Sequence, residues 1–478
     1  MKNTSTLNER AAQEVGRLLG TLGIDQVKDV GGSLAFEGTE PNFDCMHQVT
    51  MAGAVATALQ ASTVAALWRH SSGREQNIAI NLTQAAAGVY ATAFQKQNGR
   101  LIPELTLHRE LKTGFYPTAD GRWFFPTGSY PHLRNGVLDL LECPNNAPAI
   151  ARGIAKWKGL ELEEAFAEKK LTGVMVRSTQ EWRAHPQGQI LAGTPTIEIE
   201  KIGDSDPQPL SAKQRPLTGV RVIDFAHVIA GPVLTRTLAE QGADVLRLSS
   251  PMQPEAPHHI FETGVGKRNA FLELDRSEDL ATLRTLCEGA DVFVDSWRPG
   301  SLARKGFSAQ DVAKIRPGII YVSVSAYGLL GPWGQRGGFE QLGQSVSGIA
   351  DTEGGGNGNM PKLVSTRLLN DYITAYLGAA GTVAALLRRA KEGGSYHVRV
   401  SLTGISMWVQ SLGFRSAADR AGEIQIPSKL EPLLERQDSS MGVLHHLAPV
   451  AQYSQTPAHW DLPPSVLGSH MPVWLDRK

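Results

Sequence analysis

Residues 220–232 of the chain read VRVIDFAHVIAGP, a β-branched run followed by a turn of small residues and a proline. The run suits a strand that is buried on both faces, and the proline suits the first turn of a helix. Backbone N–H groups at such a helix start can face the phosphates or ring nitrogens of a ligand. The turn lacks the GxGxxG pattern of dinucleotide-binding proteins, which argues against a nicotinamide cofactor.

Three more β-branched runs follow, at residues 243–248, 291–295 and 319–324. Helical spacing separates the runs at residues 233–241, 277–288 and 309–315, with glycines near the ends of these segments. Alternating strands and helices are typical of a parallel α/β sheet. We therefore predict an α/β fold with a Rossmann-like, parallel-sheet large domain.

The composition is that of an ordinary globular protein. Lys+Arg and Asp+Glu both total 47 in 478 residues, so the formal net charge is zero. The sequence has no run of like charges that would indicate binding to nucleic acid or to anionic lipid. Three widely spaced cysteines, at positions 45, 143 and 287, fit core thiols in a reducing compartment better than disulfides or a zinc site.

No apolar signal segment occurs in the first residues of the sequence, and the most apolar run, residues 50–68, is rich in alanine and contains Gln60. We interpret this run as a buried helix and not as a membrane span. The sequence thus predicts a cytoplasmic protein without a membrane partner, a nucleic-acid partner or a bound metal.

An internal repeat links the two ends of the chain. Residues 64–69 (VAALWR) match residues 383–388 (VAALLR), and residues 78–82 (IAINL) match residues 398–402 (VRVSL) after a one-residue shift. Each copy has the pattern of a small-residue helix, a glycine-containing turn and a strand. Asp371 of the second copy falls opposite Ala52 of the first, so only one copy offers a carboxylate.

These patterns divide the chain into four predicted parts. They are an N-terminal segment with the first repeat copy (residues 1–100), a small α+β domain with a linker (101–213), the Rossmann-like domain with the Asp371 helix (214–420) and a C-terminal return segment (421–478). A hairpin is expected in the small domain at residues 119–122, which read ADGR.

Taken together, residues 215–414 resemble the family III, CaiB/BaiF-type CoA-transferases through several motifs in the same order. The motifs are PLTGVRVIDF (216–225), HVIAGP (227–232), GADV (242–245), GKR (266–268), LELD (272–275), ADV (290–292), RPG (298–300), VSAYG (324–328), GPW (331–333) and the Asp371 helix.

The resemblance implies a transferase that moves CoA from an acyl-CoA to a carboxylic acid through an aspartyl-CoA intermediate. Asp371 matches the family's nucleophilic aspartate, although by itself an aspartate at this position is also an ordinary helix cap. Both roles are compatible, because a helix N-terminus stabilises a carboxylate. Tyr327 matches a position near the acyl group, where a phenol donates a hydrogen bond, and a buried structural tyrosine is the alternative.

The same resemblance implies a site for coenzyme A, which enters as the acyl-CoA substrate. His227, Val228 and Ala230 match the loop that lines its adenine and ribose end. Lys267 and Arg304 match basic residues around its phosphates, which suit charge-assisted contacts. Without the resemblance, each would be taken for a solvated surface charge.

Three departures leave the substrate open. Ser249 stands where the family usually has an acidic residue, while formyl-CoA-transferase-like members have lysine at Ser325 and glutamine at Ile229. The small domain also precedes the Rossmann-like domain here, and residues 454–470 are similar to the family's C-terminal return. We therefore hypothesise a rearranged, fused member whose N-terminal repeat is a degenerate family half. Family members form interlocked dimers, so we expect either a homodimer or a monomer whose own halves pair.

Other functions stay open at this point. Racemases and isomerases of the superfamily carry a Gly-His-Asp stretch, and the matching residues here are Gly338, Phe339 and Glu340, which disfavours proton transfer by this route. A lyase, or a catalytically inactive CoA-binding protein, is also compatible with the sequence. The glycine-rich residues 354–358 suit either a lid over the site or a plain surface loop.

Overall fold

The computed structural model describes residues 6–41, 43–102, 114–210, 214–253, 255–416, 420 and 430–476. A seven-stranded sheet forms the large domain, with the strand order β11-β10-β9-β12-β13-β14-β8. Its strands are β8 (Glu198–Gly203), β9 (Arg221–Phe225), β10 (Asp244–Ser249), β11 (Lys267–Phe271), β12 (Val292–Asp295), β13 (Ile320–Ser325) and β14 (Ser395–Ser401). All neighbours are parallel except β14 and β8.

The strand order reverses between β9 and β12. From β9 the chain moves outward through β10 and β11, and then returns to the other side of β9 for β12, β13 and β14. In open α/β sheets a crevice lies outside the carboxyl ends of the strands at such a switch point. The α/β prediction with a parallel sheet is confirmed.

Helices cover both faces of the sheet because successive strand residues point to opposite sides. Val222 and Val292 pack into the core that contains α9 (Ala230–Ala239) and α15 (Leu369–Glu392). Their neighbours Ile223 and Phe293 join a second core under α11 (Ser277–Glu288) and α12 (Ala309–Ile315). Apolar residues of these runs therefore pack on both faces of the sheet, as the sequence indicated.

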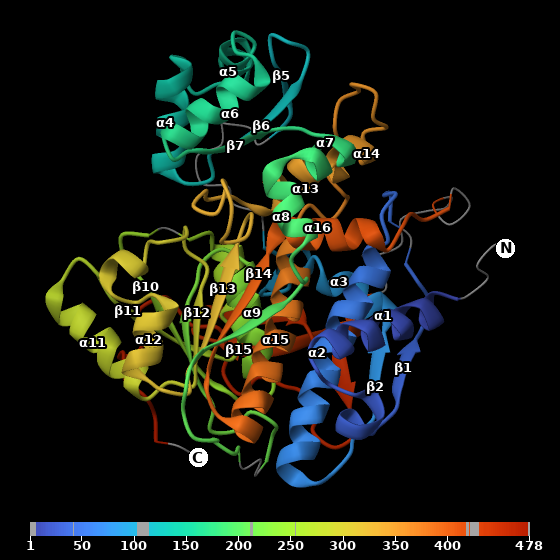
Figure 1. Cartoon of the computed structure of the whole chain (residues 1–478), viewed down its shortest axis with the longest axis vertical. Coiled ribbons are helices and arrows are strands. Elements are labelled where there is room, and N and C mark those ends of the chain that lie inside the picture. The colour runs from blue at the N-terminus through green and yellow to red at the C-terminus, as the bar shows by residue number, and fades with distance from the viewer. Residues whose placement is uncertain are drawn as a thin grey trace.

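The sequence repeat is also a repeat of secondary structure. Helix α2 (Val49–Ser72) and helix α15 each have 24 residues and lie side by side (Figure 1). They are followed by β2 (Ile78–Asn81) and β14, and then by α3 (Leu82–Gly88) and α16 (Leu402–Ser411). Asn81 and Ser401 each cap the helix that follows. The origin of the first copy as a second family half stays a hypothesis.

Helix α2 is long and apolar enough to cross a bilayer, and it is the one such helix among the described residues. The whole of its apolar window is buried inside the protein. This burial is explained by contact with α15, α1 (Leu7–Thr21) and α3. The prediction of a core helix at residues 50–68 is confirmed.

The small domain stands above the sheet (Figure 1) and has its own apolar core. Its antiparallel sheet consists of β5 (Tyr116–Pro117), β6 (Trp123–Thr127) and β7 (Thr172–Met175). Helices α4 (Pro131–Leu141), α5 (Ala147–Ile154) and α6 (Gly159–Glu168) pack on it, and α7 (Thr179–Ala184) and α8 (Pro186–Ala192) lead back to β8.

The expected hairpin at residues 119–122 joins β5 and β6, with Gly121 at a φ of 72°. The domain boundaries themselves stay predictions, and residues 103–113, 211–213 and 421–429 within them lie outside the described residues.

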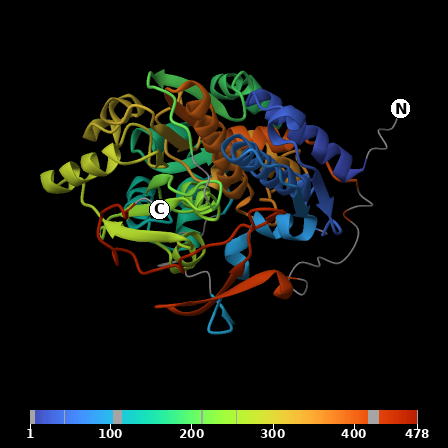
Figure 2. The same ribbon diagram turned by 90° about the horizontal axis from the view of Figure 1, so that it is seen from below.

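The N-terminal and C-terminal segments of the chain pair with each other in two small sheets. Strands β1 (Leu34–Glu37), β2 and β17 (Ala451–Tyr453) form one sheet, and β15 (Leu434–Ser439), β16 (Gly442–Leu447), β3 (Lys96–Gln97) and β4 (Arg100–Leu101) form another. Figure 2 shows the latter sheet standing out from the body of the protein. The C-terminal segment then follows the outer edge of the large sheet, where the Gly266 N–H donates to the Leu462 carbonyl at 2.8 Å.

Candidate active site

The loops after β9 and β12 flank the switch point of the sheet. His227 follows β9, and its imidazole stacks on the indole of Trp297, which follows β12, with ring centroids 4.1 Å apart. The backbone N–H of His227 donates to Ser296 Oγ at 3.1 Å. The two loops that define the crevice are thus held against each other by direct contacts.

The small domain closes this crevice with an aromatic side chain. Tyr130, at the start of α4, has its ring centroid 6.2 Å from that of His227 and 6.1 Å from that of Phe339, on which it stacks. Trp297, His227, Tyr130 and Phe339 therefore form one row, which we call the aromatic row. It brings residues of both domains into one series of ring contacts.

The turn between β9 and α9 has a strained backbone. Val228 has a φ of 67°, a left-handed conformation that β-branched residues rarely adopt. Ala230 follows as the first residue of α9 and is buried. Strain of this kind persists where the surrounding structure holds it, and it is concentrated at ligand sites. The structure thus brings His227, Val228 and Ala230 together at the strand end.

Several buried polar atoms at the strand ends have no hydrogen-bond partner among the described residues. They include His227 Nδ1, Trp297 Nε1 and the Ser249 hydroxyl. Buried polar groups in proteins are usually paired, so these atoms are available for hydrogen bonds to a ligand or to water. Burial and the nearby Arg247 charge lower the pKa of His227 to about 4, so the imidazole is neutral near pH 7.

Asp371 lies in the first turn of α15 and is buried. Burial raises the pKa of its carboxyl to about 7. A helix N-terminus favours the ionised form, whereas desolvation disfavours it and leaves it more reactive when it does ionise. Near neutral pH this carboxyl therefore exists in both forms, as a tuned catalytic group does.

Glu340, the first residue of α13 (Glu340–Ser347), lies beside Asp371 and was missed by the sequence reasoning. Its Oε1 accepts hydrogen bonds from Gln344 Nε2 at 2.6 Å and from the Asn370 N–H at 3.1 Å. Its Oε2 is buried without a partner among the described residues. Burial, and then the charge of Asp371, raise the pKa of Glu340 well above its usual range. Glu340 is thus a neutral acid next to the candidate nucleophile.

One signal for Glu340 was present in the sequence. It directly follows Phe339, the position at which the superfamily's racemases carry histidine. The sequence alone gives Glu340 no special role, because a glutamate in the first turn of a helix is common and interacts favourably with the helix dipole.

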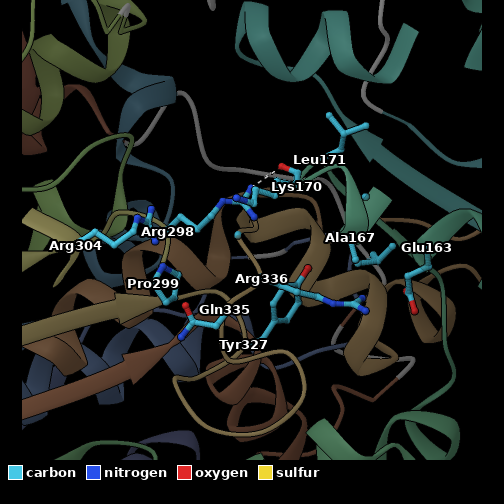
Figure 3. A pocket seen from close by; sticks show the side chains of 13 residues that line it. Glu163, Ala167, Lys170, Leu171, Arg298, Pro299, Arg304, Tyr327, Gln335 and Arg336 are labelled. Atoms are coloured by element: carbon cyan, nitrogen blue, oxygen red, sulfur yellow. Dashed lines mark hydrogen bonds between the residues drawn. The ribbon is translucent and has the colours of Figure 1, made fainter. Parts of the chain in front are cut away.

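A separate pocket of about 380 Å³ opens between the small domain and the loops after β12 and β13. Four cationic side chains line it, and we call it the basic pocket: Lys170, Arg298, Arg304 and Arg336. Figure 3 shows Arg298 reaching across to Lys170, whose backbone carbonyl accepts its hydrogen bond at 2.8 Å. The lining carboxylate, Glu163, is already paired with Arg177 at 2.5 Å. The basic pocket therefore suits an anionic group.

Tyr327 packs beside the turn that precedes α13. It lines the pocket, and its ring packs edge-on against Trp333 with centroids 5.0 Å apart. A methyl group on Gly338 would lie 3.1 Å from the Tyr327 hydroxyl. Because Gly338 precedes Phe339 and Glu340, Tyr327 lies beside the turn that leads into α13. Burial raises the pKa of Tyr327, which keeps the phenol protonated.

Lys267 and Arg304, which the resemblance places around the CoA phosphates, occupy different environments in the structure. Arg304 is exposed and lines the basic pocket. Lys267 is fully buried, and its Nζ donates to Asp224 Oδ2 at 2.7 Å and to the Pro232 carbonyl at 2.6 Å. Its ammonium thus holds α9 against β9, and it does not line the basic pocket. The phosphate role of both residues stays a prediction.

The glycine-rich residues 354–358 follow α14 (Ile349–Glu353) and form a left-handed turn, with positive φ from Gly355 to Gly358. The Gly358 carbonyl accepts a hydrogen bond from Trp123 Nε1 of the small domain at 3.0 Å. The turn therefore links the two domains in this structure. Its role as a lid stays untested. Within the described residues, no group of three His, Cys, Asp or Glu side chains could hold a metal ion.

The fold and these contacts define an α/β protein with a nucleotide-type crevice, a basic pocket and a buried carboxyl pair. Residues 217–431 match the family model described as CoA-transferase family III. This segment, which contains strands β9 to β14 and Asp371, therefore resembles CoA-transferase family III.

The curated relatives that the chain resembles have CoA-transferase names. The chain is similar to the acetyl-coenzyme A transferase nodX of Hypoxylon pulicicidum, with 33% identity over 64% of this chain and 56% of the relative. It is also similar to the succinyl-CoA–L-malate CoA-transferase alpha subunit of Chloroflexus aurantiacus, with 30% identity over 46% of this chain and 53% of the relative. The crystal structure of Rv3272 from Mycobacterium tuberculosis is 26% identical, with a TM-score of 0.39 over 41% of this chain and 58% of that one. The chain spans about half the length of the curated relatives it matches.

Proposed function

We propose that the protein is a CoA-transferase that moves CoA from an acyl-CoA donor to a carboxylic acid acceptor through an aspartyl-CoA intermediate. The observation that carries this proposal is Asp371, a buried carboxyl at a helix N-terminus with a pKa of about 7. The names of relatives that act as CoA-transferases support the reaction class.

The proposed chemistry begins with the Asp371 carboxylate attacking the thioester carbonyl. The carbon–sulfur bond breaks, and the CoA thiolate leaves a mixed anhydride between Asp371 and the acyl group. The thiolate then attacks the Asp371 carbonyl and releases the donor acid, which produces the aspartyl-CoA thioester. An acceptor carboxylate repeats the same two displacements in reverse order. Covalent catalysis of this kind divides one difficult transfer into easier steps.

The position of coenzyme A follows from the charges and the aromatic rings. We propose that its phosphates meet Arg304 and Arg298 of the basic pocket, and that its base lies along His227 and Trp297. Aromatic faces suit a purine ring, and guanidinium groups suit phosphate oxygens. The thioester end then points toward Tyr327 and Asp371.

Glu340 supports the same reaction as a proton donor. Its Oε1 already accepts two N–H groups, so the proton of the neutral acid lies on the unpaired Oε2. A neutral acid beside Asp371 stabilises the negative charge that develops on a tetrahedral intermediate. It also avoids the repulsion that two adjacent carboxylates would suffer.

The activity should depend on pH through Asp371. Only the ionised carboxyl is a nucleophile, and burial raises its pKa to about 7. We therefore expect kcat/KM to fall about tenfold for each pH unit below this value and to level off above it. Steady-state assays across this range test the expectation. A profile that stays flat down to about pH 5 would contradict the assigned pKa.

Arg304 should act on binding more than on chemistry. We expect Arg304→Ala to raise the KM for acyl-CoA about tenfold, with kcat changed less than about twofold, because it removes one charge-assisted phosphate contact. Arg276→Ala is the matched control, since Arg276 is an exposed arginine outside the pocket that pairs with Glu278. Equal KM values for the two variants would show that Arg304 does not contribute to the binding of acyl-CoA.

The function itself is tested by trapping the intermediate. The protein is incubated with a panel of acyl-CoA donors and then with hydroxylamine, and the peptide that contains residue 371 is analysed by mass spectrometry. A hydroxamate on Asp371 is the expected adduct, and Asp371→Asn should lack it. The absence of an adduct with every donor, or an undiminished adduct in Asp371→Asn, would refute the covalent proposal.

A further inference from the structure

Arg247 is a buried cation that the proposed mechanism does not use. It lies on β10, and its side chain is fully buried. One of its Nη atoms pairs with Glu255 Oε2, and another lies 3.4 Å from the Thr263 hydroxyl. Its Nε has no hydrogen-bond partner among the described residues. Glu255 is thus the carboxylate that pairs directly with Arg247, and the charge of Asp224 on the neighbouring strand also favours the guanidinium.

This ion pair lies on the strand beside the one that leads to the aromatic row. Arg247 of β10 is paired in register with Asp224 of β9, and His227 follows β9. In agreement with this placement, the charge of Arg247 lowers the pKa of His227, and the charge of Glu255 contributes to the raised pKa of Tyr130. Glu255 belongs to the loop after β10, at the same edge of the sheet as His227. The pair therefore lies buried on β10 and the loop that follows it, where the Ser249 hydroxyl also has no hydrogen-bond partner among the described residues.

Glu255 differs from the acidic partners of the other buried cations nearby. Lys267 pairs with Asp224 of β9, and Arg236 pairs with Glu262 of α10 (Pro257–Thr263). Both of those carboxylates belong to regular elements whose backbone hydrogen bonds hold them. Glu255 comes from an irregular segment whose residues 251–253 are exposed. Its carboxylate can therefore leave Arg247 at a smaller structural cost than the other two.

We propose that Arg247 is an anion-binding subsite of the crevice, and that Glu255 occupies it until a phosphate group of the ligand displaces the carboxylate. A buried guanidinium needs an anionic partner at all times, and exchanging one anion for another preserves this pairing. Phosphate oxygens match the planar donors of arginine as well as carboxylate oxygens do. Glu255 then acts as an internal competitor that weakens ligand binding.

The inference rests on the proposed function for the identity of the ligand as a CoA ester, but not for the subsite itself. Glu255→Gln removes the competing charge and leaves Arg247 without its directly paired carboxylate. We expect the ligand-free variant to melt several degrees lower than the wild type. We expect CoA to bind it about tenfold more tightly, because no carboxylate has to be displaced. The CoA-induced rise in melting temperature should exceed that of the wild type.

Glu262→Gln is the matched control, since it also leaves a buried arginine unpaired. It should lower the melting temperature without tightening the binding of CoA. Glu255→Asp keeps the charge on a shorter side chain and provides a second, milder variant with an intermediate gain in affinity. Calorimetry and melting curves are measured for all four proteins with CoA and, separately, with inorganic pyrophosphate.

Unchanged or weaker binding of both probes by Glu255→Gln and Glu255→Asp would overturn the inference and leave Glu255 as a purely structural partner of Arg247. Failure of CoA to bind any of the four proteins would count against the proposed function. In that case a larger stabilisation of the Glu255 variants by pyrophosphate still supports the subsite, and equal stabilisation overturns it.

Discussion

Asp371→Asn is expected to lower kcat for CoA transfer by about 10⁴-fold, because the amide cannot attack a thioester. The substitution keeps the size of the side chain and its place in the first turn of α15. Substrate binding should change little, since the proposed CoA contacts come from the basic pocket and the aromatic row. Steady-state kinetics and direct binding of acyl-CoA measure the two quantities separately.

The same variant should fold at least as well as the wild type. Burial raises the folded-state pKa of Asp371 above its unfolded value, so its contribution to stability is complete below about pH 4 and is lost as the pH rises through about 7. Removing the ionisable group removes that loss. We therefore expect a higher melting temperature for Asp371→Asn than for the wild type above neutral pH.

Asp351→Asn is the matched control for loss of a carboxyl. Asp351 is partly buried on α14, and burial also raises its pKa, but it lines neither the basic pocket nor the aromatic row. This control should retain activity. A residual kcat within about tenfold of the wild type in Asp371→Asn would exclude Asp371 as the nucleophile.

Lys267→Met is expected to destabilise the protein by about 3–5 kcal/mol, because it leaves Asp224 as an uncompensated charge in the core. Both side chains of the ion pair are fully buried, and Thr235 adds a hydrogen bond to Asp224 at 2.7 Å. Chemical denaturation followed by circular dichroism measures the loss in the free energy of unfolding. We expect the purified variant to be poorly soluble or partly unfolded.

A double variant separates the structural role from a phosphate contact. Lys267→Met with Asp224→Leu replaces the buried ion pair by apolar groups and should recover most of the lost stability. If Lys267 binds phosphate, the single variant will instead remain stable and show a raised KM for acyl-CoA. That outcome would require the ammonium to leave Asp224 when the substrate binds.

Much of the large domain could be predicted from local patterns. Helices α11 and α12 begin and end at the expected residues, and the four β-branched runs agree with β9, β10, β12 and β13 to within one residue at each end. Apolar periodicity and glycine positions are local signals, so they can be recognised in the sequence without knowledge of the tertiary contacts. The hairpin at residues 119–122 was predictable for the same reason, because Asp-Gly favours a tight turn.

The partners of side chains were not predictable in the same way. The family resemblance implied a phosphate role for Lys267, yet its ammonium is buried and pairs with Asp224, 43 residues away in the sequence. Glu340 became part of the candidate site only because the start of α13 is packed beside the start of α15. Such contacts depend on strand order and domain placement, which no short window of sequence contains.

The sequence by itself determined that residues 220–232 form a strand, a turn and a helix start, and that the Asp371 helix exists twice with a single carboxylate. These features follow from local sterics and from apolar periodicity. Only the tertiary structure decided that β9 and β12 meet at a switch point, that Tyr130 closes the crevice from the small domain, and that Asp371 has a neutral acid beside it. The pKa of a carboxyl depends on the water and charges around it, and these come from residues brought together only by folding.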